Sequence, residues 1–356
     1  MEPIKTDCVG CDAHRRYSVF VVMDERGHTG KETRVEHSRE LYRHFLSTLP
    51  PGSPIALESI GNWYWMIEEM ERAGHQPILA HAKKAKLMMG LTNKTDKLDA
   101  RGLALLLRNG TLPSVWIPPG ELRDQRELPR MRMVFARIRT MLKNRIQSTL
   151  AKYGIQIDQV SDLFGVTGRG LLQNRLNELP QETQRSIQEH LKLLDGVLEQ
   201  IEGTEKRIKE LIKETPQMQL LMSLPGVGPI LAIVIILEIG DIERFPGAPK
   251  LASYAGTVPQ VKSSGGKTYY GKVRPDVNRY LKWAFIEAAN SIVVNQRRMP
   301  NRHVIQLYHR IMKRKGHPKA IVAVARHLAE ATYWMLTKNE AYREPTSSRW
   351  ISPTQK

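Results

Sequence analysis

The sequence predicts an α/β domain at its N-terminal end, followed by two mainly helical regions. Residues 8–107 alternate short apolar runs with stretches of helical periodicity, which is typical of a sheet packed by helices. A proline-rich segment interrupts the chain at residues 113–120, and beyond it helical periodicity dominates. A chain of 356 residues is long enough for two or three domains of ordinary size.

The first domain is predicted to begin with a three-stranded meander, because three strand-like runs follow one another without an intervening helix. These runs are Cys8–Asp12, Ser18–Met23 and Thr29–Val35, and a helix over His37–Leu49 follows them. After the breaker Pro50-Pro51-Gly52, the pattern predicts a fourth strand ending at Glu58, a helix to Ala73, a strand over Gln76–Ala80, and helices near His81–Met89 and Asp96–Leu107. This order predicts a mixed sheet packed by helices.

A long basic helix is predicted after the proline-rich linker, from Glu121 to about Tyr153. No acidic residue occurs between Leu128 and Ile157. Charge of one sign along a helix favours contact with phosphates, whereas the alternative, a merely solvated face, usually mixes both signs. The predicted nucleic-acid ligands on this helix are Arg130, Arg132, Arg137, Arg139, Lys143 and Arg145.

The next helix carries apolar residues at alternating spacings of three and four, which is the pattern of a coiled coil. The positions are Leu191, Leu194, Leu198, Ile201, Ile208 and Ile212, with Glu205 where another apolar residue is due. This seam packs either against the basic helix of its own chain or against a second subunit. About three heptads do not separate the two cases.

A third region begins at Pro216. Within it, the segment Ser223–Pro229 leads into an apolar helix and resembles a helix-hairpin-helix element. In such an element Gly226 and Gly228 present backbone N–H groups to phosphate, although the same residues also suit a simple tight turn. A glycine-rich loop is predicted near Ser263–Gly271, with helices over Pro275–Asn290 and Ala320–Leu336. The predicted domains are residues 1–113, 114–215 and 216–344, followed by a polar tail over 345–356.

Charge and cysteine content limit the partners and the compartment. The chain has 54 Lys and Arg against 36 Asp and Glu, a formal net charge of +18, which points to a polyanionic partner but does not by itself imply catalysis. Cys8 and Cys11 are the only cysteines, and without a second pair they do not predict a zinc site. No leader and no apolar run of about 18 residues is found, so we expect a cytoplasmic protein without disulfides or membrane contact.

Four carboxylates stand where an RNase H-like (RuvC-like) nuclease needs them. Asp12 ends the first predicted strand, Glu58 ends the fourth, and Asp96 and Asp99 share one face of a later helix. Converging carboxylates select hard cations, and two Mg²⁺ or Mn²⁺ ions about 4 Å apart stabilise the attacking and leaving oxygens of phosphodiester cleavage. Each residue also has a structural alternative: Asp96 and Asp99 as a helix cap and a dipole-complementing acid, Asp12 as a turn residue, and Glu58 as an arginine partner.

Three acidic motifs carry a specific resemblance. Gly10-Cys11-Asp12, Leu57-Glu58-Ser59-Ile60-Gly61 and Asn93-Lys94-Thr95-Asp96-Lys97-Leu98-Asp99-Ala100 resemble those of the DEDD insertion-sequence transposases. The segments Ser223–Gly228, Ala255–Pro259 and Ser263–Lys267 are similar to the second, transposase domain of that family, so the resemblance spans nearly the whole chain. Members of this family are bridge-RNA-guided serine recombinases, which also resemble pilin-gene invertases.

The resemblance implies roles for individual residues. Asp12, Glu58, Asp96 and Asp99 would hold magnesium, and a serine of the glycine-rich loop would attack DNA and become covalently joined to it. We assign this serine as Ser264, with Ser263 as the second choice and a flexible turn as the structural alternative. Lys267, Lys272 and Arg274 nearby are predicted phosphate ligands. Where the family commonly has Ser-Lys-x-Gly, this chain has Val273-Arg274-Pro275-Asp276, so its local DNA contacts are expected to differ.

The sequence thus predicts a transposase or site-specific recombinase of an insertion sequence, acting as a homo-oligomer, either a dimer or a tetramer. Its partners would be element and target DNA and a structured guide (bridge) RNA, the last implied by the resemblance alone. The resemblance also implies a site built from two subunits, with the nuclease-like domain of one meeting the serine domain of another. The alternatives are a Holliday-junction resolvase-like metal nuclease, which hydrolyses DNA with the carboxylates alone, and a noncatalytic DNA-binding protein.

Overall fold

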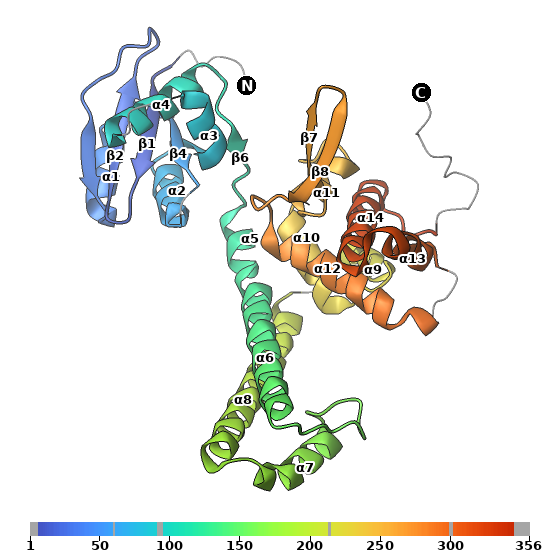
Figure 1. The fold of residues 1–356 in the computed structure, drawn as a ribbon. Coiled ribbons are helices and arrows are strands. Elements are labelled where there is room, and N and C mark those ends of the chain that lie inside the picture. The colour runs from blue at the N-terminus through green and yellow to red at the C-terminus, as the bar shows by residue number, and fades with distance from the viewer. Residues whose placement is uncertain (1–5, 60, 91–94, 213–214, 299–301, 345–356) are drawn as a thin grey trace. The chain divides into compact units, whose positions relative to one another are not determined.

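The computed structural model describes residues 6–59, 61–90, 95–212, 215–298 and 302–344, and the chain divides into two compact units, residues 1–120 and 121–356 (Figure 1). The predicted polar tail lies outside the described residues. The first unit extends past the predicted boundary at residue 113, because Ser114–Val115 forms a short strand that pairs with the sheet. Within the described ranges, no helix is long and apolar enough to cross a membrane.

Unit 1 is built on a six-stranded mixed sheet. Its strands are β1 (Cys8–Ala13), β2 (Tyr17–Met23), β3 (Thr33–Glu36), β4 (Pro54–Glu58), β5 (Gln76–Ala80) and β6 (Ser114–Val115). They lie in the order β3-β2-β1-β4-β5-β6. The first three form the predicted antiparallel meander, β4 and β5 run parallel to β1, and β6 runs antiparallel to β5. The predicted mixed sheet is therefore confirmed.

The third strand begins later than predicted. Regular pairing with β2 starts at Thr33, whereas the apolar pattern predicted a start at Thr29. The intervening chain makes only an isolated bridge from Thr29 to Met23, and the N–H of Gly30 bonds to the carbonyl oxygen of Val22. These local bonds extend the turn after β2 and delay the strand.

Helices cover both faces of this sheet. They are α1 (Arg39–Ser47), α2 (Trp63–Arg72), α3 (Ala82–Met89) and α4 (Asp96–Arg108). Tyr42 of α1 and Met66 of α2 belong to the same core cluster as Cys11, whereas Leu103 of α4 belongs to a second cluster with Cys8. The two cysteines therefore point to opposite faces of the sheet, as predicted for strand positions three apart, and both thiols are free.

Unit 2 is mainly helical. Its α-helices are α5 (Gly120–Gln125), α6 (Glu127–Lys152), α7 (Val166–Arg175), α8 (Gln181–Leu211), α9 (Pro216–Met222), α10 (Pro229–Ile239), α11 (Ala248–Tyr254), α12 (Arg279–Val294), α13 (His303–Lys315) and α14 (His317–Lys338), and short 3₁₀ helices occupy Leu176–Glu178 and Gln296–Arg298. The prediction of one continuous helix from Glu121 to Tyr153 is wrong, because α5 and α6 are separated at Arg126. Pro129 explains the break, since a proline ring clashes with the carbonyl group four residues earlier, here that of Gln125.

The basic helix α6 and the helix α8 lie side by side within unit 2 (Figure 1). Leu142 of α6 and Leu194 and Ile201 of α8 belong to one core cluster. In this structure the predicted seam of α8 thus packs against the basic helix of its own chain. Glu205, which interrupts the seam, accepts hydrogen bonds from Arg132 of α6 at 2.9 and 2.7 Å, so an ion pair replaces an apolar contact at this level.

The largest core cluster lies among α9–α14, and a hairpin connects α11 to α12. Its strands are β7 (Pro259–Ser264) and β8 (Lys267–Val273). The prediction of a glycine-rich loop near Ser263–Gly271 is wrong, because most of these residues belong to the two strands. Gly265 and Gly266 form a tight turn at φ values of +56° and +75°, a combination that glycine adopts without strain and that suits the twist of a two-stranded hairpin.

Candidate active site

Two of the predicted carboxylates lie at adjacent strand ends. β1 and β4 are parallel neighbours with Cys11 opposite Leu57, so the next residues, Asp12 and Glu58, lie at the same edge of the sheet. Both residues are buried, Asp12 with 8% and Glu58 with 6% of its surface exposed. Two carboxylates at this depth are unlike a solvated surface pair and need compensating charge.

The helix α4 carries the other two carboxylates. The hydroxyl of Thr95 accepts a hydrogen bond from the N–H of Leu98 at 3.3 Å and so caps α4. Asp96 is therefore the first helical residue, and the alternative in which it caps the helix is wrong. Asp99 follows on the same helical face and is buried. Both acids lie in the first turn, where the helix dipole favours negative charge.

Gly10 determines how closely α4 approaches the sheet. A Cβ atom at this position would lie 1.9 Å from the carbonyl oxygen of Ala100 and 2.7 Å from the backbone nitrogen of Ala104. Only glycine permits this approach of strand and helix backbones. Gly10 therefore positions the helix that carries Asp96 and Asp99.

Two residues absent from the predicted set complete the cluster. Nε2 of His14 lies 3.2 Å from a carboxylate oxygen of Asp12 and 3.2 Å from one of Asp96. The hydroxyl of Tyr17 donates to Asp96 at 3.0 Å, and its ring lies 4.6 Å, centroid to centroid, from that of His14. The position of His14, two residues after Asp12, was a sequence signal that could have identified it. Tyr17 reaches the site only because β2 folds back along β1.

Burial and the neighbouring acids change the pKa of Asp12. Burial raises this pKa, the neighbouring His14 lowers it, and the negative charges of Asp99, Glu58 and Asp96 raise it further, to about 6 from an ordinary value of 3.8. All four predicted carboxylates therefore share one electrostatic environment. A divalent cation among them would replace repulsion with attraction.

The donor set fits such a cation. Ligand atoms of Asp12, His14 and Asp96 all lie within 4.8 Å of one another. Carboxylate oxygens with one imidazole nitrogen suit Mg²⁺ or Mn²⁺, and Mn²⁺ accepts the nitrogen ligand more readily. Glu58 and Asp99 lie close enough for their negative charges to raise the pKa of Asp12. Asn93, Lys94 and Ile60 of the acidic motifs lie outside the described residues.

Ser264 lies at the tip of the β7–β8 hairpin in unit 2. It pairs with Lys267 across the Gly-Gly turn, and both side chains are exposed. Tyr269 and Tyr270 of β8 are 62% and 72% exposed, so the ribbon presents large side chains to solvent. An uncovered two-stranded hairpin gains little stability by itself, and exposed aromatic side chains in such a place favour contact with a partner.

The other residues predicted near the serine differ in their environment. Ser263, the second choice, pairs with Thr268 one step further from the turn. Lys267 and Lys272 are exposed on β8. Arg274 instead donates two hydrogen bonds to Asp276, the shorter at 2.6 Å, inside the segment that departs from the family pattern.

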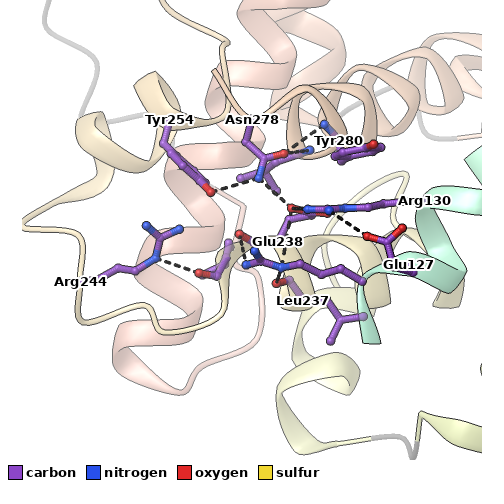
Figure 2. A network of polar contacts seen from close by, with 11 residues as sticks. Glu127, Arg130, Leu237, Glu238, Arg244, Tyr254, Asn278 and Tyr280 are labelled. Carbon is purple, nitrogen blue, oxygen red and sulfur yellow. Dashed lines mark hydrogen bonds and ion pairs between the residues drawn. The ribbon is translucent and has the colours of Figure 1, made fainter. Parts of the chain in front are cut away.

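A buried network ties the base of this hairpin to the basic helix (Figure 2). Glu238 of α10 accepts from Arg130 of α6 at 2.8 and 3.1 Å and from Asn278 at 2.8 Å. Asn278 also caps α12 and donates to the hydroxyl of Tyr254, the last residue of α11, at 3.1 Å. Tyr254 and Asn278 flank the segment that carries Ser264, so its two ends are bonded to each other and one of them, Asn278, is bonded to Glu238.

Several basic residues of α6 have internal partners. Arg130 bonds to Glu238 and Arg132 to Glu205, and each guanidinium side chain is only 17% exposed. Lys143 lies 3.8 Å from Asp162. The structure therefore gives these predicted phosphate ligands a role in packing unit 2.

Arg137 and Arg139 are placed differently. In the part of the chain that the structure describes, neither guanidinium has an ion-pair or hydrogen-bond partner, and the same holds for Arg145. Arg137 and Arg139 line a cleft of about 520 Å³ that also includes Gly226. Gly226 has a φ of +76°, and a Cβ atom there would lie 2.3 Å from the carbonyl oxygen of Ala288 in α12, so the turn itself needs glycine.

Comparison with known proteins gives similarity over both units. Residues 218–304 match the family described as Transposase IS116/IS110/IS902, and residues 9–155 match the DEDD transposase domain of the IS110 type. A probable family 20 transposase of Pseudomonas aeruginosa is 24% identical, over 94% of this chain and 98% of its own. The transposase of insertion sequence IS1111A from Coxiella burnetii is 26% identical, over 71% and 69%, and that of IS1328 from Yersinia enterocolitica is 25% identical, over 76% and 79%.

Proposed function

The chain belongs to the IS110/IS116 family of DEDD transposases, and on that premise we propose that it recombines DNA through its carboxylate cluster and a covalent serine intermediate. The observation that carries the proposal is the convergence of Asp12 and Asp96 on His14, with Glu58 and Asp99 close enough to raise the pKa of Asp12. These residues come from two strand ends and one helix, as the RNase H-like (RuvC-like) arrangement requires.

The four carboxylates would hold Mg²⁺ or Mn²⁺, which when bound stabilises the attacking and leaving oxygens of a phosphodiester. The neighbouring side chains would organise this centre. Tyr17 donates to Asp96 and fixes one carboxylate oxygen, so the other remains available. Nε2 of His14 lies 3.2 Å from both Asp12 and Asp96, so His14 would either join the ligands or move away from them when a cation binds.

We assign Ser264 as the nucleophile. Its Oγ would form an ester with the phosphorus of one DNA end, and the bond that breaks would release a deoxyribose hydroxyl on the other end. Because one phosphoester replaces another, a hydroxyl of a second DNA strand can reverse the exchange and rejoin the DNA without ATP. The exposed position of Ser264 at the tip of a projecting hairpin supports access to DNA, with Lys267 and Lys272 as phosphate ligands.

Further partners belong to the same proposal. Arg137, Arg139 and Arg145 would contact phosphates along α6, and the net charge of +18 supports a polyanionic partner. The turn at Gly226–Gly228, which precedes α10, would contribute backbone N–H groups as a helix-hairpin-helix element does. Guidance by a structured RNA follows from family resemblance alone. Assembly into a dimer or tetramer follows from the two-subunit site that the resemblance implies, and the heptad pattern of α8 predicts a coiled-coil helix.

The experiment that tests the proposal incubates the purified chain with end-labelled element-junction DNA, candidate element RNA and Mg²⁺, and resolves the products on a denaturing protein gel. We expect label on the wild-type protein and none on Ser264→Ala or Asp12→Asn. Ser263→Ala is the matched control, because it removes the neighbouring hydroxyl on the same strand and should keep the label.

Other outcomes would contradict the proposal in distinct ways. Cleaved DNA without attached label, in both the wild type and Ser264→Ala, would favour a hydrolytic metal nuclease. Label that disappears with Ser263→Ala instead would move the nucleophile by one residue. DNA binding that is unchanged by Asp12→Asn, with no cleavage by any protein, would favour a noncatalytic role.

A further inference from the structure

A cleft in unit 2 has features that neither the carboxylate site nor the serine hairpin uses. It has a volume of about 520 Å³ and is lined by α6, by the turn before α10, and by α12. This size lies within the range of small-molecule sites and is sufficient for one nucleotide. The lining includes Arg137, Arg139, Gly226, Trp283 and Glu287.

Two of the three arginines that line the cleft, Arg137 and Arg139, are not used in packing. Arg137 and Arg139 have no ion-pair or hydrogen-bond partner among the residues that the structure describes, unlike Arg132 on the same helix, which is bound to Glu205. Two guanidinium groups at one cleft form a site for phosphate, since each can donate two parallel hydrogen bonds to its oxygens.

Trp283 gives the cleft an aromatic surface. It lies near the start of α12, is half-buried, and packs one part of its side chain against the main core of unit 2. Within the described ranges, no other ring and no cation stacks on its indole. A rigid aromatic ring beside unpaired cations is the combination by which proteins bind unstacked bases together with their phosphates.

We propose that this cleft binds one unpaired nucleotide of a nucleic-acid strand, with its base stacked on Trp283 and its phosphate held by Arg137 and Arg139. The inference rests on the proposed function in that it names a ligand of the recombinase. Duplex DNA does not fit this role, because its bases are stacked on one another and offer no free face. Glu287 at the rim accepts hydrogen bonds and so adds contacts to the amino groups of a base rather than to phosphate.

The shared chemistry is a single-stranded nucleotide, whether from DNA or RNA. To test it, binding is measured by fluorescence anisotropy with labelled single-stranded DNA, single-stranded RNA of the same sequence, and blunt duplex DNA. The full-length Ser264→Ala chain is used in EDTA, so that neither cleavage nor metal binding contributes. The cleft variants are Trp283→Ala, Trp283→Phe and Arg137→Ala, and Trp334→Ala on α14, where the ring is 52% exposed, is the matched control.

We expect Trp283→Ala to weaken single-strand binding roughly 10-fold and duplex binding less than about 2-fold, with Trp283→Phe recovering most of the loss. Arg137→Ala should weaken single-strand binding and reduce its salt dependence. Binding of the single strand should also quench tryptophan fluorescence, and Trp283→Phe should abolish that quenching while Trp334→Ala does not. Tighter binding of RNA than DNA would identify the cleft as a site for an RNA partner, and the reverse would identify a DNA strand.

Equal losses for single strand and duplex in Trp283→Ala, or no loss in Trp283→Ala with quenching retained in Trp283→Phe, would overturn the proposal. If Trp283→Ala does not fold, the phenylalanine variant and the quenching measurement decide the outcome. Failure here is separate from failure of the serine mechanism, because the binding assay uses a chain that lacks the Ser264 hydroxyl and contains no metal.

Discussion

Replacing Asp12 with asparagine should stabilise the metal-free protein and remove its response to Mg²⁺. The pKa of Asp12 is raised to about 6 from an ordinary value of 3.8, so the folded chain favours the protonated acid. The free energy of unfolding therefore falls as the pH rises from 3.8 to about 6. Above about pH 6, Asp12 is ionised and destabilises the folded chain by the full amount. A shift of this size corresponds to at most about 3 kcal/mol.

Asparagine removes this charge. Because the raised pKa already includes the attraction of His14 and the shift gives an upper bound, we expect a net gain of about 1–2 kcal/mol, or several degrees in melting temperature. The assay is thermal unfolding followed by circular dichroism, in EDTA and in excess Mg²⁺, at about pH 8 and about pH 5. Wild-type protein should gain stability from Mg²⁺ at the higher pH, since ligand binding to the folded state stabilises it, whereas Asp12→Asn should not.

Asp24→Asn is the matched control in the same unit. Asp24 is exposed, and bonds from His28 lower its pKa, so removal of its charge should give no gain in stability. A loss of stability by Asp12→Asn in EDTA at the higher pH, together with a Mg²⁺ response equal to that of the wild type, would contradict this prediction. That result would mean that the acids do not repel one another and that Asp12 binds no cation.

Three further substitutions test other parts of the fold. Gly10→Ala should lower the free energy of unfolding in urea by about 1–3 kcal/mol and weaken Mg²⁺ binding, because its Cβ atom would push α4 away from the sheet. Gly61→Ala is the control and should do neither, because a Cβ atom there would have nothing within 4 Å. Glu69→Gln should lower the free energy of unfolding by about 2 kcal/mol near neutral pH. The arginines of α1 lower the pKa of this buried acid to about 2. The difference in stability between variant and wild type, measured by urea unfolding, should therefore shrink as the pH falls from 4.5 toward 2. Glu238→Gln should destabilise unit 2 by about 3 kcal/mol by calorimetry, and an effect no larger than that of the exposed Glu127→Gln would contradict the network.

The carboxylates could be predicted because local pattern determines where their elements end. Asp12 and Glu58 each follow a continuous apolar run, and such runs become neighbouring buried strands. His14 was not predicted as part of the site because its role depends on α4 reaching the end of β1. That approach depends on Gly10, whose importance is visible only once the helix is packed on the strand.

Elsewhere the sequence carries only a weak local signal, or none. The β7–β8 ribbon is exposed on both faces, so it shows no alternation of apolar and polar residues, and only the Gly265-Gly266 pair between strand-forming residues such as Tyr269 marked a hairpin. The pairing of Arg132 with Glu205 joins residues far apart in the chain, and charge pattern along one helix does not reveal it. Arg132 was therefore predicted to bind phosphate, whereas in the folded chain it forms an ion pair with Glu205.

Glu238 also determines how unit 2 comes apart. If α6 detached alone, Glu238 would remain in the core without the guanidinium of Arg130, at a cost of about 3–5 kcal/mol. Local opening of the basic helix is therefore disfavoured relative to unfolding of the whole body, and the amides of α6, α10 and the start of α12 should exchange with solvent as one cooperative group. The helix that we propose to contact nucleic acid and the residues that support the proposed nucleophile are thus protected from fraying by the same buried acid.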